Sequence, residues 1–189
     1  MVLIVGITGA SGAICGIRLL EVLSEMEDIE IHLVISKHGE ATIKHETDYS
    51  IDSVRALADT VYDVDDIGAA LASGSFKRDG MIVAPCSIKT MSALANSYLD
   101  NLLIRAGDVT LKERKRLVLM VRETPLHLGH LRNTVQLTEM GAIIFPPIPS
   151  FYGRPQVIDD IINSTTGRVL DMFDIEHSLS RRWAGLAST

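Results

Sequence analysis

The sequence predicts an α/β fold, a parallel β-sheet with helices on both faces, in a chain of 189 residues. Short apolar runs typical of buried strands alternate along the chain with amphipathic runs of helical period. The first apolar run leads directly into a glycine-rich loop and a helix. This alternation favours a parallel sheet, because each strand then returns to the same edge through a crossover helix. We expect one domain, spanning residues 1–189.

The apolar runs and the helical patterns give the expected elements. Strands are predicted over residues 2–5, 29–36, 81–84, 117–121 and 142–145. Helices are predicted over residues 14–23, 40–46, 50–57, 86–98, 100–108, 128–140 and 157–173, with Gly141 ending the sixth of them. Residues 58–78 show no regular pattern, and we expect a loop there.

Composition excludes several classes of protein. The formal net charge of −6 argues against a nucleic-acid-binding protein, which needs a basic face. No apolar run is long enough for a membrane-spanning helix, so no membrane partner is expected. Cys15 and Cys86 are the only cysteines, too few for a disulfide framework, which favours a cytoplasmic location.

The loop after the first strand has the character of an anion-binding turn. Gly6, Gly9 and Gly12 permit close approach of a ligand, and the free N–H groups at the start of the next helix suit a phosphate. Ser11 adds a hydroxyl group. The spacing is not the G-x-G-x-x-G fingerprint, and the loop lacks a P-loop lysine, so neither ATP nor a dinucleotide is indicated. A glycine-rich turn without a ligand is the alternative.

Polar side chains follow all five expected strands, where ligands bind in parallel sheets. In chain order they are residues 9–12, Ser36 with Lys37, residues 86–90, Arg122 with Glu123, and Tyr152 with Arg154. Ser87, Lys89 and Thr90 could bind an anion or could simply cap a helix. An adjacent arginine and glutamate could hold a phosphate and move a proton, or could be two surface charges before Pro125.

Three other clusters are interpreted as ordinary surface groups. Asp63, Asp65 and Asp66 resemble a solvated loop more than a metal site. His127 and His130 lack a third ligand, so no metal is expected. The basic run at residues 112–116 has the pattern of a solvated helix end.

Six motifs, in order, resemble the flavin prenyltransferases of the UbiX type over almost the whole chain. They are GASG at residues 9–12, PCSIKT at 85–90, LKER at 111–114, VRETP at 121–125, PSFY at 149–152 and GRVLD at 167–171. The resemblance implies a flavodoxin-like or Rossmann-like fold that binds FMN in a homo-oligomer, typically a dodecamer. It also implies transfer of a dimethylallyl group from dimethylallyl monophosphate to N5 and C6 of reduced FMN. The product, prenylated FMN, would serve a separate cognate decarboxylase of the UbiD type.

The same resemblance assigns roles to individual residues. It implies FMN contacts from Gly9, Ala10, Ser11, Gly12, Ser36, Ser87, Ile88, Lys89, Thr90 and Arg122. Tyr152 and Arg168 would hold the prenyl phosphate, and Lys112 would reach in from a neighbouring subunit. Glu123 would take the ring proton, and Glu46 and Ser11 are further catalytic candidates.

Two other functions stay open at this point. A flavin-dependent cysteine-type decarboxylase shares the motif at residues 85–90 but carries Asn where Lys89 stands. A non-catalytic flavoprotein subunit would not need Lys112, Tyr152 and Arg168 as a second phosphate site. The sequence leaves open whether the product serves ubiquinone synthesis or the breakdown of aromatic acids.

Overall fold

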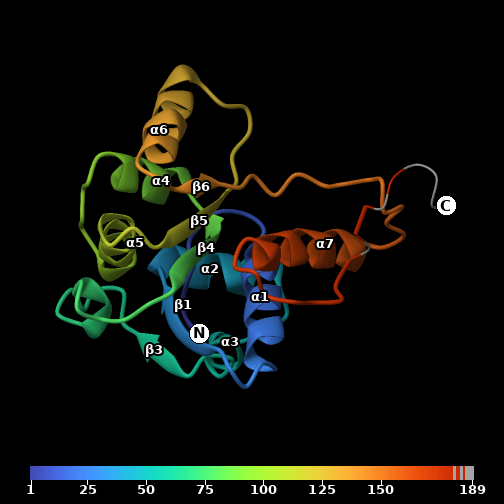
Figure 1. Cartoon of the computed structure of the whole chain (residues 1–189), viewed down its shortest axis with the longest axis horizontal. Helices are drawn as coiled ribbons and strands as arrows, with labels where there is room; N and C mark the ends of the chain where they lie inside the picture. Colours follow the sequence, from blue (N-terminus) through green and yellow to red (C-terminus); the bar gives the residue numbers. More distant parts are fainter. Residues whose placement is uncertain (181, 184, 186–189) are drawn as a thin grey trace. The chain divides into compact units, whose positions relative to one another are not determined.

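The computed structural model describes residues 1–180, 182, 183 and 185. The chain divides into two compact units, Met1–Pro146 and Pro147–Thr189. The first unit contains the β-sheet and most of the helices, and the second contains one long helix (Figure 1).

The sheet of the first unit is parallel, as predicted, and has six strands. They are β1 (Val2–Ile7), β2 (Glu30–Ile35), β3 (Thr60–Tyr62), β4 (Gly80–Cys86), β5 (Arg116–Val121) and β6 (Ile143–Ile144). Their order across the sheet is β3-β2-β1-β4-β5-β6. This is the strand order of Rossmann-type folds, in which the direction of winding reverses between β1 and β4. Ligands bind such sheets beyond the carboxyl ends of the strands at that reversal point.

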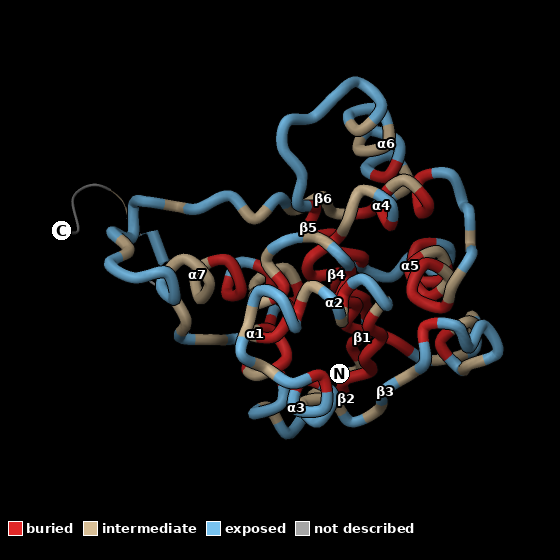
Figure 2. Tube along the Cα trace, turned by 180° about the vertical axis from the view of Figure 1, so that it is seen from behind, coloured by how far each residue is buried: buried red, intermediate tan, exposed pale blue. Residues whose placement is uncertain are grey.

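Helices cover both faces of this sheet. They are α1 (Ala13–Ser24), α2 (Lys37–Glu46), α3 (Ile51–Arg55), α4 (Ile88–Ala95), α5 (Leu102–Lys112) and α6 (Leu128–Glu139), with a 3₁₀ turn at Ala70–Ala72. Gly6 of β1 faces Leu103 of α5, whereas the side chain of Ile7 faces Gly16 of α1, since side chains of a strand alternate between faces. The strands β1 and β4 are accordingly buried (Figure 2). No helix among the described residues is long and apolar enough to span a membrane.

The observed elements differ from the predicted ones mainly at their ends. The segment expected as a loop contains β3, a three-residue edge strand too short to leave a periodic pattern. The third predicted strand continues through Pro85 to Cys86, and the register against β5 shifts between Val83 and Cys86. Proline is tolerated at such an irregularity because a regular ladder hydrogen bond is not required there. Helix α2 begins earlier than predicted, because the Ser36 hydroxyl accepts the N–H of Gly39 and caps it.

The second unit contains α7 (Ile158–Asp171). The Asp160 carboxylate accepts the backbone N–H groups of Gln156 (2.7 Å) and Val157 (3.1 Å), which fixes the entry to the helix. Thr165, Thr166, Gly167, Val169 and Leu170 form its buried side.

Candidate functional site

A buried threonine ties the carboxyl ends of β1 and β4 together at the reversal point. The Thr8 hydroxyl donates to the Pro85 carbonyl (2.8 Å) and accepts the N–H of Ser87 (2.8 Å). Thr8 is 1% exposed, so the two exit loops are held in a fixed relation. Sequence reasoning did not select this residue, although its position between the strand and the glycine loop is the available signal.

The first turn of α1 already holds an anionic side chain. The Glu46 carboxylate accepts the backbone N–H groups of Gly12 (2.8 Å) and Ala13 (3.3 Å) and the hydroxyl of Ser11. Burial alone would raise the pKa of Glu46, but these hydrogen bonds and the charge of Arg122 outweigh burial and lower it. The structure therefore joins two catalytic candidates, Ser11 and Glu46, at the helix end where a phosphate was expected.

Replacing Glu46 with glutamine is expected to destabilise the protein by about 0.5 kcal/mol at neutral pH, the low end for an N-terminal helix contact, because the carboxylate is largely exposed. Since the folded-state pKa is lowered, this contribution is present above the ordinary value of 4.5 and is lost as pH falls through the folded value. Urea unfolding of the wild type and of Glu46→Gln from pH 7 to pH 3 measures the difference between their free energies of unfolding. Glu25→Gln, at the other end of α1, is the control, and a gap that does not narrow on acidification would contradict the assignment.

The loops after β1 and β2 pack directly on each other. A Cβ atom at Gly9 would lie 2.4 Å from Cβ of His38, and one at Gly39 would lie 2.6 Å from the Ile7 carbonyl oxygen. Gly12 has a φ of 97°, a left-handed conformation that glycine adopts without strain. Ser36 therefore lies next to the glycine loop, because these glycines admit the close approach.

The start of α4 shows both properties considered for it. Ser87 caps the helix by accepting the N–H of Thr90 (3.3 Å), and their hydroxyl groups lie 3.1 Å apart. The first turn of α4, which includes Ile88, has no acidic side chain. Lys89 is exposed, and its ammonium lies 3.6 Å from the Asp100 carboxylate. This helix end thus combines helical N–H groups with an exposed cation, an arrangement that suits an anion.

Arg122 and Glu123 follow β5 at the same edge. The N–H of Arg122 donates to the Cys86 carbonyl (3.2 Å), which places its backbone beside the end of β4. The Glu123 carboxylate accepts the N–H of Thr124 (2.9 Å), and both residues are exposed. Cys86, whose carbonyl accepts this N–H of Arg122, is fully buried, which raises the pKa of its thiol far above the usual range and argues against a nucleophilic role.

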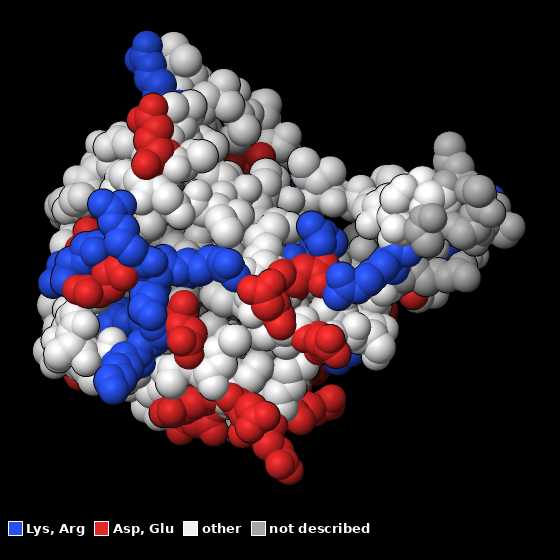
Figure 3. Space-filling model, viewed as in Figure 1, with Lys and Arg blue, Asp and Glu red and all other residues white. Residues whose placement is uncertain are grey.

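Lys112 lies at the opposite edge of the sheet. It ends α5, and β5 starts four residues later at Arg116, so Lys112 is near the amino ends of the strands. Its ammonium pairs with Glu113, and this hydrogen bond, together with the positive charge, lowers the pKa of the Glu113 carboxyl group. Figure 3 shows Lys and Arg side chains gathered on the part of the unit that α5 occupies in Figure 1. Lys112 therefore does not join the loops at the carboxyl edge of its own sheet.

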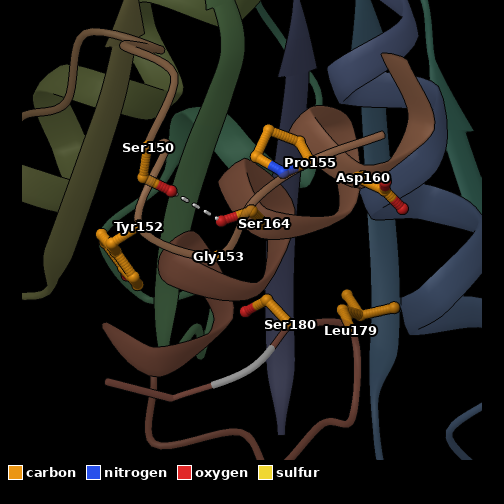
Figure 4. Close-up of a pocket in the computed structure, with 8 residues that line it drawn as sticks. All are labelled: Ser150, Tyr152, Gly153, Pro155, Asp160, Ser164, Leu179 and Ser180. Carbon is orange, nitrogen blue, oxygen red and sulfur yellow. Dashed lines mark hydrogen bonds between the residues drawn. The ribbon is translucent and has the colours of Figure 1, made fainter. Parts of the chain in front are cut away.

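Tyr152 lines a pocket of about 190 Å³ within the second unit. Ser150, Ser164 and Ser180 give it hydroxyl groups, and the first two are hydrogen bonded to each other at 3.1 Å (Figure 4). The ring of Tyr152 also makes an edge contact with Trp183, with centroids 5.6 Å apart.

Arg168 is held by a neighbouring carboxylate in α7. It donates to Asp171 (2.5 Å), which also contacts His177 (3.2 Å) and Arg182 (2.9 Å). Burial alone would raise the pKa of Asp171, but these partners outweigh it and lower it. A Cβ atom at Gly167 would lie 2.5 Å from the His177 ring, so this glycine makes room for it. Sequence reasoning selected Arg168 but missed Asp171, although the i, i+3 spacing signals the pair.

The other candidate clusters have local partners. Asp63 and Asp66 accept backbone N–H groups in turns, and Asp65 pairs with Lys37 at 2.5 Å. The rings of His127 and His130 contact each other in a tilted arrangement, with centroids 3.6 Å apart. No group of three or more metal-ligating side chains occurs within the described part of the chain.

Comparison with known proteins identifies the family of this chain. A family model described as Flavoprotein matches residues 1–175. The chain is 58% identical over 185 residues to the flavin prenyltransferase UbiX of Thauera aromatica, covering 98% of this chain and 95% of that protein. The protein belongs to the flavin prenyltransferase family of the UbiX type and is a transferase, which confirms the resemblance.

Two solved structures agree with this assignment. One is AnUbiX (PadA1) in complex with FMN and dimethylallyl pyrophosphate, with 50% identity, a TM-score of 0.95 and 97% coverage of both chains. The other is a dodecameric FMN-dependent UbiX-like decarboxylase from Escherichia coli O157:H7, with 50% identity, a TM-score of 0.96 and coverage of 98% and 100%. The predicted fold is confirmed by these matches.

Proposed function

We propose that this protein transfers a dimethylallyl group from dimethylallyl monophosphate to N5 and C6 of reduced FMN and delivers the prenylated FMN to a cognate decarboxylase. The observation that carries the proposal is the set of family motifs whose polar groups meet where the winding of the sheet reverses. Thr8, Ser87 and Arg122 lie at this edge, joined by hydrogen bonds between the loops. That edge is where a Rossmann-type sheet binds a nucleotide.

The residues at this edge fit FMN. The starts of α2 and α4 offer helical N–H groups and hydroxyl groups, and Lys89 and Arg122 add positive charge for a phosphate. Within the loop at residues 9–12, the position of a Cβ atom at Gly12 is open, so a flat ring can approach the loop closely there. When bound and reduced, FMN supplies the electron-rich ring that accepts the prenyl group, so no serine or cysteine nucleophile is needed.

Lys112, Tyr152 and Arg168 are proposed to hold the phosphate of the donor. As negative charge grows on the leaving phosphate, an arginine fork, a lysine ammonium and a phenol donor stabilise it. Because Lys112 lies at the amino edge of its own sheet, another copy of the chain must bring it to the site. This supports a homo-oligomer, and we propose a dodecamer like the Escherichia coli relative.

We also propose that the two units act as one domain in the cytoplasm. The matching family model runs from residue 1 to residue 175 and therefore spans both units. Cys15 and Cys86 are free thiols, as a reducing compartment favours.

The reaction itself tests the proposed function. The protein, reduced FMN and dimethylallyl monophosphate are incubated without oxygen, and the flavin is extracted for mass spectrometry. A gain of one five-carbon unit is expected, whereas a cysteine-type decarboxylase or a non-catalytic flavoprotein would return unchanged FMN. If the assembled wild-type protein binds FMN but the extracted flavin shows no gain in mass, the proposal is refuted.

Glu123→Gln is expected to bind FMN normally and to slow ring closure by about 10²–10⁴-fold, because glutamine keeps the shape but cannot accept the ring proton. Quenched samples should accumulate flavin that carries the prenyl group at one position only. Glu139→Gln, on the exposed end of α6, is the control. Unchanged product formation would transfer the role of base to Glu46 or to solvent.

A further inference from the structure

Arg78 is a buried cation that the proposed reaction does not use. Its residue is 3% exposed and lies two positions before β4. The next residue anchors it to the sheet, because the N–H of Asp79 donates to the Val2 carbonyl (2.8 Å) and the Asp79 carboxylate accepts the N–H of Val2 (2.7 Å). The backbone of Arg78 is thus fixed at the amino edge of the sheet.

The guanidinium of Arg78 joins a loop to α5. It donates to the carbonyls of Leu71 (3.0 Å) and Ser73 (2.7 Å) and to that of Ala106 in α5 (3.3 Å). It also lies over the ring of Phe76, 5.3 Å from the centroid. A buried charge is costly unless it is hydrogen bonded, so the conformation that makes these hydrogen bonds is strongly favoured over conformations of the loop that lack them.

A second arginine holds the carbonyl between those two. Nε of Arg105 donates to the Ala72 carbonyl (3.2 Å), and Nη1 donates to Asp108 (2.8 Å). Two guanidinium groups therefore fix three successive carbonyls, those of residues 71–73. We refer to Arg78 and Arg105 as the loop clamp.

The clamped loop lies against Lys112. A Cβ atom at Gly74 would be 2.7 Å from Nζ of Lys112 and 2.3 Å from Oε1 of Glu113. The ammonium and its partner carboxylate therefore rest on the loop backbone immediately after the clamped carbonyls. A shift of the loop would change the position of the ammonium, because the two are in direct contact.

We propose that Arg78 is a positioning residue for the transferase reaction, acting through the loop at residues 71–75 to fix the Lys112 ammonium for the site of a neighbouring copy. This inference rests on the proposed function, in which Lys112 contacts the donor phosphate. Arg78 touches neither FMN nor donor in this scheme. Its loss changes the use of the donor without changing the binding of flavin.

The test compares Arg78→Met and Arg78→Lys with Leu137→Ala and Lys112→Ala. Leu137 is fully buried in α6, so Leu137→Ala lowers stability without touching the loop clamp. Four quantities are measured on assembled protein: hydrogen exchange of residues 70–78, the affinity for FMN, and both KM and kcat for dimethylallyl monophosphate.

Arg78→Met is expected to speed exchange at residues 70–78 and to raise KM for the donor about tenfold, because misplacing one charged contact weakens transition-state and donor binding. FMN affinity should stay at the wild-type value. Arg78→Lys should fall between, since an ammonium keeps the charge but cannot span three carbonyls. Leu137→Ala should leave both KM and the local exchange unchanged.

Unchanged exchange at residues 70–78 in both Arg78 variants would overturn the inference. The inference would also be wrong if Lys112→Ala raises KM or lowers kcat for the donor but Arg78→Met changes neither, and the proposed function would then stand. If Lys112→Ala itself leaves both KM and kcat unchanged, the assignment of Lys112 is wrong and the inference falls with it. The Lys112→Ala result therefore separates the two kinds of failure.

Discussion

Lys112→Ala is expected to reduce prenyl transfer about tenfold to a hundredfold while FMN still binds, because one charged hydrogen bond to the leaving phosphate is lost. The side chain is exposed and ends a helix, so its removal should leave folding intact. Single-turnover rates with saturating donor measure the effect. Lys115→Ala, in the same basic run, is the matched control and should retain the wild-type rate.

The position of Lys112 also predicts that Lys112 and Arg122 variants complement each other in mixed assemblies. Arg122→Ala should be inactive for a different reason, because Arg122 serves the carboxyl edge of its own sheet. If Lys112 acts in a neighbouring copy, assemblies co-expressed from equal amounts of both variants should recover about a quarter of wild-type activity, since a quarter of the sites then have both residues.

Each variant alone, and a mixture of separately assembled variants, gives the baseline for this experiment. Activity no higher than that baseline in the co-expressed sample would show that Lys112 and Arg122 act within one chain or do not share a site. If light scattering shows a stable monomer and this monomer is active, Lys112 does not act in a neighbouring copy.

The fold was largely predictable because its determinants are local. Strands β1, β4 and β5 carry uninterrupted apolar runs, and β2 carries one that is broken only by His32; this pattern follows from burial on both faces of a parallel sheet. The strand β3 escaped because it is three residues long and Val61 at its centre is 40% exposed. An edge strand needs no continuous apolar run, so the sequence carried no signal for it.

The sequence predicted at which edge of the sheet the candidate site lies, but it did not predict the contacts within the site. The rule that ligands bind beyond the carboxyl ends selected Ser36, Ser87 and Arg122 correctly as neighbours of that edge. It could not show that Glu46, the last residue of α2, would bond the first turn of α1. That contact depends on how two helices pack, and no motif in the chain encodes it.

The residues that hold the loops in place were still harder to predict from the sequence. Thr8 and Arg78 act through hydrogen bonds to main-chain carbonyls, and a sequence does not show which carbonyls lie nearby. Arg78 was in a segment without periodicity, and buried arginines are uncommon, so an exposed loop residue was the natural expectation.

The choice of donor is the last expectation, and we expect dimethylallyl monophosphate to be preferred over the diphosphate. Prenyl diphosphates usually need Mg²⁺ held by clustered carboxylates. Here Asp63 and Asp66 accept hydrogen bonds in their own turns, and Asp65 pairs with Lys37. The proposed phosphate site offers protein cations instead, and Asp171 already neutralises part of the charge of Arg168. The remaining charge matches a monophosphate better than a diphosphate.

Arg168 supplies the variant series for this expectation. Arg168→Ala should lower the rate with monophosphate about tenfold to a hundredfold, and Arg168→Lys should lower it less, since charge is kept while the fork is lost. Asp159→Asn, on the exposed start of α7, is the control for a changed charge in this helix. Equal losses in the alanine and lysine variants would mean that the fork geometry, not the charge, decides.

The deciding comparison is turnover with monophosphate and EDTA against turnover with diphosphate and Mg²⁺. We expect the first pair to work at the full rate and chelation to have no effect, because lysine and arginine do not depend on a metal ion. If only the second pair works, the assignment of Lys112, Tyr152 and Arg168 to the donor phosphate is wrong, and the acidic turn at residues 63–66 becomes the segment to mutate next.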